Sequence, residues 1–189
     1  MGRFHKESSD ENRITKAISI ISRTAVSNLA SIISNLIRMN YAIQILRQTR
    51  QNYLTILEAL TTEQLLTIPT GFKNNILWNM GHTIVVQNLL TYGLSDLAIP
   101  IEAELVEKYR KGSQASSHVA DSEIEAIKAL LTSSITQLES DLAAGIFKTF
   151  KSYPTSYGVT LNNIQDAVTF NNAHEALHLG FVMAMRKLL

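Results

Sequence analysis

The sequence predicts an all-α protein folded as a four-helix bundle. Four long segments carry apolar residues that recur every three or four positions, which is the period of an amphipathic helix. A long connection separates the second of these segments from the third, and no segment shows a convincing strand-like alternation. The chain has 189 residues, of which 46% are hydrophobic, enough for one domain with a sizeable core.

The composition narrows the classes of function. The absence of cysteine excludes disulfides, thiolate metal sites and a cysteine nucleophile, so any thiol chemistry would need an external thiol. A formal net charge of +1 gives no argument for a nucleic-acid partner. No run reaches the roughly 18 apolar residues of a membrane-spanning helix. We therefore expect a cytoplasmic protein with neither a nucleic-acid nor a membrane partner.

Residues 1–38 differ from the rest of the chain, and we treat them as a separate segment ahead of a domain at 39–189. No acidic residue occurs between Glu11 and Glu58, and apolar residues are spaced as in an amphipathic helix. The segment is either an additional N-terminal helix that packs on the bundle or an extension ahead of a true start at Met39. We favour the extension, since Met39 directly precedes the first segment of the domain pattern.

The first helix of the domain is predicted from Asn40 to Leu60, where apolar residues recur at helical spacing. Thr61 and Gln64 then form a capping-box pattern, in which each side chain satisfies a backbone N–H of the other residue. This box predicts a short helix that stops at Pro69.

The second long helix is expected to begin with Asn74 or Asn75 as its cap and to run to about Thr91. Gly93 lies just past that end, as is typical of helix termination. Residues 93–120 read as a connection that contains a short helix at 101–111.

The third long helix is predicted to open with a capping box at Ser122 and Glu125 and to end at Gly145. Residues 146–160 contain proline, glycine and several aromatic residues and are expected to form a long loop. The fourth helix then begins at about 160–162 and continues to the C-terminus.

The residues that point to chemistry are three histidines on two of these helices. His174 and His178 lie four positions apart, so a helix presents both imidazoles on one face. His82 lies among apolar residues of the second helix. Neutral imidazoles bind zinc, nickel, copper or iron(II), and three of them leave a fourth position for water or substrate. The alternative is that these histidines are hydrogen-bonded residues of the core.

The other two histidines and three asparagines have less specific roles. His5 lies in a polar terminal segment and His118 in a serine-rich loop, so both are expected at the surface. Asn79, Asn171 and Asn172 lie within one helical turn of a histidine and are candidates for orienting an imidazole.

Residues 174–178 also match the H-E-x-x-H pattern of zinc proteases, in which Glu175 would be the general base. That mechanism usually takes a third ligand from further downstream. The eleven residues after His178 contain no His, Asp or Glu. We therefore expect Glu175 to be a solvated or ion-paired helix residue.

The order of these motifs resembles the DinB/YfiT-like family of metalloenzymes. The resemblance covers about residues 39–189 and rests on three segments, Leu60–Leu65, Trp78–His82 and His174–Gly180. It implies an up-down-down-up four-helix bundle whose divalent metal, such as zinc, nickel or iron, is bound by His82, His174 and His178. It also implies a homodimer, and it places a small residue, Gly180, where helices pack closely.

The resemblance implies an enzyme that acts on a small molecule, although no catalytic residue is assigned. The leading function is a thiol-dependent S-transferase, in which the metal activates a low-molecular-weight thiol or water. Two alternatives are a hydrolase that uses metal-bound hydroxide and a non-catalytic metal-binding stress-response protein. The loops at 93–120 and 146–160 would shape the pocket, with Tyr153 and Tyr157 as candidate lining residues.

Overall fold

The computed structural model describes the backbone of residues 4–189 and the side chains from residue 25 onward. This part of the chain is mostly helical, which confirms the predicted fold class. Its elements in chain order are α1 Phe4–Glu58, α2 Thr62–Leu66, α3 Ile76–Thr91, η1 Gly93–Ser95, α4 Ala103–Tyr109, α5 Asp121–Ala144, β1 Tyr153–Pro154, β2 Thr160–Leu161, α6 Ile164–Met185 and η2 Arg186–Leu188. None of the described helices is long and apolar enough to cross a membrane.

The chain divides into two compact units, Met1–Asn40 and Tyr41–Leu189. The first unit is helical from Phe4 onward, and α1 continues through Met39 without a break. The N-terminal helix that we considered is therefore continuous with the helix predicted from Asn40, since no glycine or proline interrupts the sequence at this point. That residues 1–38 are an extension ahead of a start at Met39 stays a prediction. The side chains of residues 4–24, including His5 and the first half of the predicted apolar stripe, lie outside the described part.

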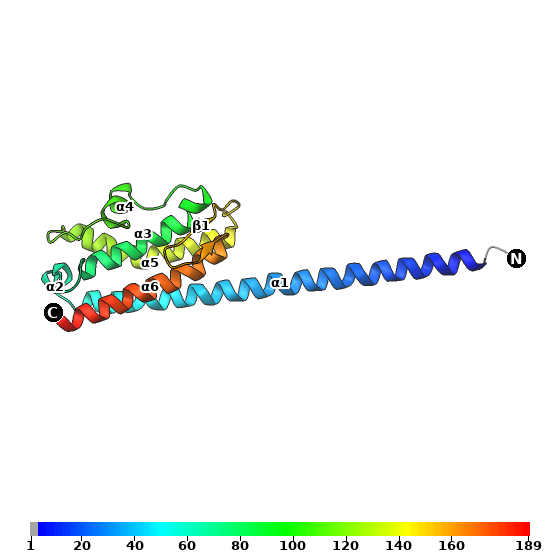
Figure 1. Ribbon diagram of the computed structural model, residues 1–189, viewed down its shortest axis with the longest axis horizontal. Helices are drawn as coiled ribbons and strands as arrows, with labels where there is room; N and C mark the ends of the chain where they lie inside the picture. Colours follow the sequence, from blue (N-terminus) through cyan, green and yellow to red (C-terminus); the bar gives the residue numbers. More distant parts are fainter. Residues whose placement is uncertain (1–3) are drawn as a thin grey trace. The chain divides into compact units, whose positions relative to one another are not determined.

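The second unit is a bundle of four long helices (Figure 1). In the picture α3 and α5 run in one direction, while α6 and the cyan part of α1 run in the other. This is the up-down-down-up order. Helix α3 lies at the centre, in contact with α4, α5 and α6, and nearly all of its residues are buried. A helix that is buried all round needs apolar residues on every face, which explains why α3 shows little amphipathic pattern.

Two of the three predicted N-terminal helix caps are confirmed. Thr61 and Gln64 form the capping box of α2, and the side chain of Asn75 accepts a hydrogen bond from the backbone N–H of Trp78 at the start of α3. The predicted box at Ser122 and Glu125 is wrong. Helix α5 already begins at Asp121, so Ser122 lies inside its first turn and cannot cap it.

The two long connections differ slightly from the prediction. The first contains η1 in addition to the expected short helix, which is α4. Helix α5 ends at Gly145 in the left-handed conformation (φ 64°), as predicted. In the second connection β1 pairs antiparallel with β2, with Tyr153 opposite Leu161. Strands of two residues are too short to produce a visible sequence alternation.

Close packing occurs at Gly81 and not at Gly180, where we expected it. A Cβ atom added at Gly81 would lie 2.5 Å from the ring of Tyr109, whereas one added at Gly180 would meet no atom within 4 Å. The absence of a side chain at Gly81 therefore lets the end of α4 approach α3.

We expect Gly81→Ala to lower the free energy of unfolding by roughly 1–3 kcal/mol, because the added methyl group must displace Tyr109. Gly180→Ala is the matched control. It should leave stability unchanged or raise it by up to about 1 kcal/mol, since alanine is the better helix former. Urea unfolding of both variants measures the difference, and a Gly81→Ala protein as stable as the wild type would contradict it.

Candidate metal centre

The structure brings the three predicted histidines together between α3 and α6. The ring centroids of His82 and His174 are 5.3 Å apart, those of His82 and His178 4.8 Å, and those of His174 and His178 4.6 Å. Each ring offers one nitrogen, and these three atoms lie within 4.8 Å of one another. Such a cluster could hold one metal ion. His118 lies apart from it, exposed in the loop before α5, where its ring contacts Ser117.

Hydrogen bonds fix the orientation of two of the rings. Nδ1 of His82 lies 2.7 Å from the carbonyl oxygen of Tyr109, and Nδ1 of His178 lies 2.8 Å from Oδ1 of Asn79. Both partners are acceptors, since the Asn79 amide nitrogen donates to the carbonyl of Asn75. Each Nδ1 therefore carries the proton and donates, which leaves Nε2 with its lone pair available for a ligand.

The third ring has no such anchor. Nδ1 of His174 is buried, and no hydrogen-bond partner for it is found among the described side chains and backbone. A buried imidazole nitrogen without a partner costs free energy. Of the three asparagines that we considered, only Asn79 orients a histidine. Asn171 donates to Glu175, and Asn172 donates to the carbonyl of Ala42.

Burial keeps the three imidazoles neutral at physiological pH. It lowers the pKa of His174 to about 3, with a further contribution from the neighbouring charges of His178, His82 and Arg50. Burial and then the charge of His82 lower the pKa of His178 to about 4, and burial also lowers the pKa of His82. Neutral imidazole is the form that binds a metal, so no proton has to leave at pH 7.

A buried ion pair holds the helix that carries the histidine pair. The carboxylate of Glu175 accepts from Nε of Arg50 at 2.6 Å and from Nη2 at 2.7 Å, and both residues are almost fully buried. Arg50 also donates to Gln87 on α3, and the hydroxyl of Tyr53 donates to the backbone carbonyl of Glu175. This network connects α1, α3 and α6 directly beside His174.

The same pair decides the role of Glu175 in the H-E-x-x-H pattern. Its carboxylate is 0% exposed and is occupied by Arg50 and Asn171, so it cannot activate water at the histidines. Ion pairing was predicted correctly, but solvation was not. Arg50 was not among the predicted site residues, although it lies in helical register with the core residues Leu46, Tyr53 and Leu57. A lone arginine in an apolar stripe indicates a buried partner.

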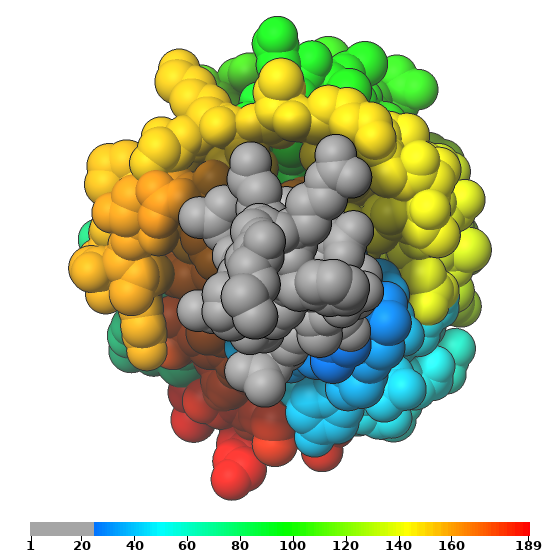
Figure 2. Space-filling model, turned by 90° about the vertical axis from the view of Figure 1, so that its right-hand side faces the viewer, coloured from blue at the N-terminus to red at the C-terminus, as the bar shows by residue number. Residues whose placement is uncertain are grey.

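A cavity of about 420 Å³ lies beside the histidines, and His82 and His174 form part of its wall. Residues from both long connections line it, as predicted, among them Leu94, Lys111 and Tyr153. Tyr157, the other candidate, is 70% exposed and does not line it. Figure 2 shows the segment 146–160, drawn in yellow, arching over this end of the bundle. The cavity gives a small molecule a place next to the cluster.

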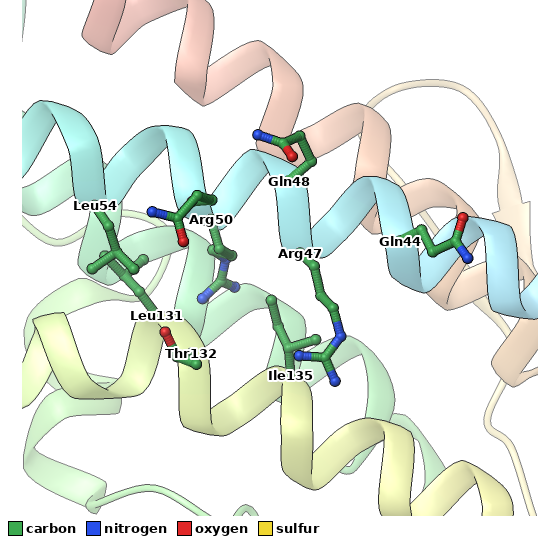
Figure 3. Close-up of a pocket in the computed structure, with 9 residues that line it drawn as sticks. Gln44, Arg47, Gln48, Arg50, Leu54, Leu131, Thr132 and Ile135 are labelled. Atoms are coloured by element: carbon green, nitrogen blue, oxygen red, sulfur yellow. The ribbon is translucent and has the colours of Figure 1, made fainter.

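A second groove, of about 350 Å³, lies between α1 and α5 and contains no histidine (Figure 3). The picture shows Arg50 pointing into the bundle and Arg47 pointing towards α5. Both guanidinium groups are already paired, Arg50 with Glu175 and Arg47 with Glu139. The histidine cluster with its cavity is therefore the better candidate for a functional site.

Comparison with known proteins agrees with this fold. Residues 45–182 match the family model of the DinB superfamily, and the chain belongs to that superfamily. A crystal structure described as the conserved protein of locus from Enterococcus faecalis is similar over 79% of this chain and 95% of that chain. The TM-score is 0.53 and the sequence identity 15%, so this likeness shows the fold alone. A search of curated proteins finds no match.

We expect Glu175→Gln to lower the free energy of unfolding by roughly 3–5 kcal/mol, because it leaves the Arg50 charge buried without a counter-charge. The exposed pair of Arg47 and Glu139 supplies the control, and Glu139→Gln should cost less than about 1 kcal/mol. Urea unfolding at pH 7 separates the two. Equal, small losses would show that the buried pair does not hold the bundle, and a fully stable Glu175→Gln protein would reopen the general-base role.

The lowered histidine pKa values predict a specific pH dependence for the metal-free protein. The unfolded chain takes up protons on these residues below about pH 6.5, whereas the folded chain resists until about pH 4 for His178 and about pH 3 for His174. The stability is therefore complete above about pH 6.5 and falls as the pH is lowered. His174→Asn should flatten this fall and His118→Asn should not. Unfolding series between pH 7 and pH 4 test this, and parallel curves for all three proteins would refute it.

Proposed function

We propose that the protein binds one divalent transition metal ion through His82, His174 and His178 and is a metal-dependent enzyme acting on a small molecule. The observation that supports this most is the convergence of three neutral imidazoles from two helices beside a cavity. The reaction that we favour is thiol-dependent S-transfer. A homodimer and a cytoplasmic location stay predictions.

The residues present fit such an ion. The donor set is three imidazoles with no carboxylate or thiolate, which suits zinc, nickel or iron(II). The buried Nδ1 of His174 lacks a hydrogen-bond partner among the described residues. Metal binding by this ring would offset the free-energy cost of that missing hydrogen bond. Three protein ligands leave a position for a further ligand. An ion held in this way lowers the pKa of a thiol or water that binds it.

The protein's own residues would position and shield the reaction. The carbonyl of Tyr109 and the amide of Asn79 hold His82 and His178 with Nε2 turned away from the hydrogen bond. The pair of Arg50 and Glu175 fixes the turn of α6 that carries His174. The apolar cavity wall limits the access of water, which strengthens electrostatic interactions at the site.

The chain supplies no thiol of its own, because it contains no cysteine. S-transfer would therefore use a separate low-molecular-weight thiol. Strict dependence of turnover on an added thiol supports the transferase. Turnover of an ester or amide in water alone supports the hydrolase instead.

We expect the untagged protein to contain about one equivalent of a transition metal, because its three-imidazole donor set matches a catalytic metal site. His82→Ala and His174→Ala should each lose it, since each removes one of three ligands, and His118→Ala should retain it. Metal analysis by mass spectrometry measures the content.

Trp78 gives a second, independent readout of metal binding. It is the only tryptophan and stacks on His82, with ring centroids 4.5 Å apart. Cobalt(II) or nickel(II) added to the metal-free protein should therefore quench its fluorescence. No metal uptake, even after reconstitution, would overturn the proposal and leave the histidines as core residues.

A further inference from the structure

The cavity beside the histidines has a composition that selects its ligand. Most of its wall is apolar, formed by Val86, Leu89, Leu90, Leu94 and Phe170. Removing apolar surface from water is worth about 25 cal/mol per Å², so a ligand body that fits this wall is itself apolar. The volume of about 420 Å³ lies at the lower end of the range of small-molecule sites, which implies a small ligand.

One side chain, Lys111, gives the cavity wall a positive charge. Lys111 is the single Lys, Arg, Asp or Glu among the described residues that line it. Within residues 25–189 no carboxylate pairs with Lys111, whereas the nearby Lys108 is paired with both Glu104 and Glu123. Lys111 and His82 line the same cavity. The cavity therefore favours a negative group and disfavours a positive one.

We propose that this cavity binds a small monocarboxylate with an apolar body. The carboxylate faces Lys111, and the apolar chain lies against Val86, Leu89 and Phe170, with His82 and His174 in reach. The inference deepens the proposed function, since it names the substrate class of the same site. The charged pocket is nevertheless a property of the protein without metal, so the two proposals can be tested apart.

Short-chain carboxylates are suitable probes, and Trp78 again gives a specific signal. The chain has one tryptophan, so its indole N–H gives one NMR resonance, next to His82 in the cavity wall. In titrations of the metal-free and the zinc-loaded protein, hexanoate should shift this resonance. Hexanoate should bind roughly tenfold more tightly than butyrate, because it buries two more methylene groups. Hexylamine, of equal length and opposite charge, should not bind.

The decisive comparison is between two lysine variants. Lys111→Met should weaken hexanoate binding about 10–100-fold in both metal states, as expected for the loss of a hydrogen bond to a charged group. Lys187→Met, an exposed lysine outside the cavity, should bind like the wild type. Equal affinity of the wild type and Lys111→Met would overturn the inference. Binding of hexylamine, or hexanoate binding that needs zinc and not Lys111, would do the same.

Metal analysis of the same samples separates the two proposals. Hexanoate binding that depends on Lys111, in a protein that takes up no metal, would support the pocket and overturn the metal site. Metal uptake without any shift by hexanoate would overturn the pocket alone.

Discussion

The buried ion pair between Arg50 and Glu175 is the interaction on which the rest of the second unit depends. It joins the first and last helices of the bundle, and Gln87 ties the central helix to the same guanidinium group. Two charges in an apolar interior are tolerated only when their geometry and hydrogen bonds are nearly complete. That requirement fixes the rotation of α6 about its own axis. Because His174 and His178 lie on the same helix, the pair also sets where their imidazoles point.

The central helix imposes the second constraint. Helix α3 is buried on all sides, so the ring nitrogens of His82 can bond only to groups of the protein that pack against this helix. Gly81 allows Tyr109 to approach, and the carbonyl of Tyr109 then accepts a hydrogen bond from Nδ1 of His82. Asn79, one turn away from His82 on the same helix, accepts a hydrogen bond from Nδ1 of His178. The residues that pack the bundle are thus the ones that present two lone pairs to a common point.

These constraints also produce the cavity. The imidazoles of His82 and His174 lie between two helices, and the connection that carries β1 closes over that end of the bundle. Among the side chains that the structure describes, the wall of this small apolar space has one cation, Lys111, and the neutral imidazoles of His82 and His174. An apolar wall with few polar groups is the usual composition of a small-molecule site. The same packing that builds the core therefore also builds the apolar cavity beside the histidines.

The sequence by itself determined the helical class, the order of the long helices and the common helical face of His174 and His178. The meeting of His82 with that pair was predicted, and packing between α3 and α6 produces it. Helical periodicity, the caps at Thr61 and Asn75, and the spacing of the histidine pair are local properties that one segment carries alone. The tertiary structure decided which residues surround those histidines. Arg50 meets Glu175 across 125 positions, and Lys111 reaches the cavity from a loop. Such contacts follow from packing between distant segments, which no local pattern records.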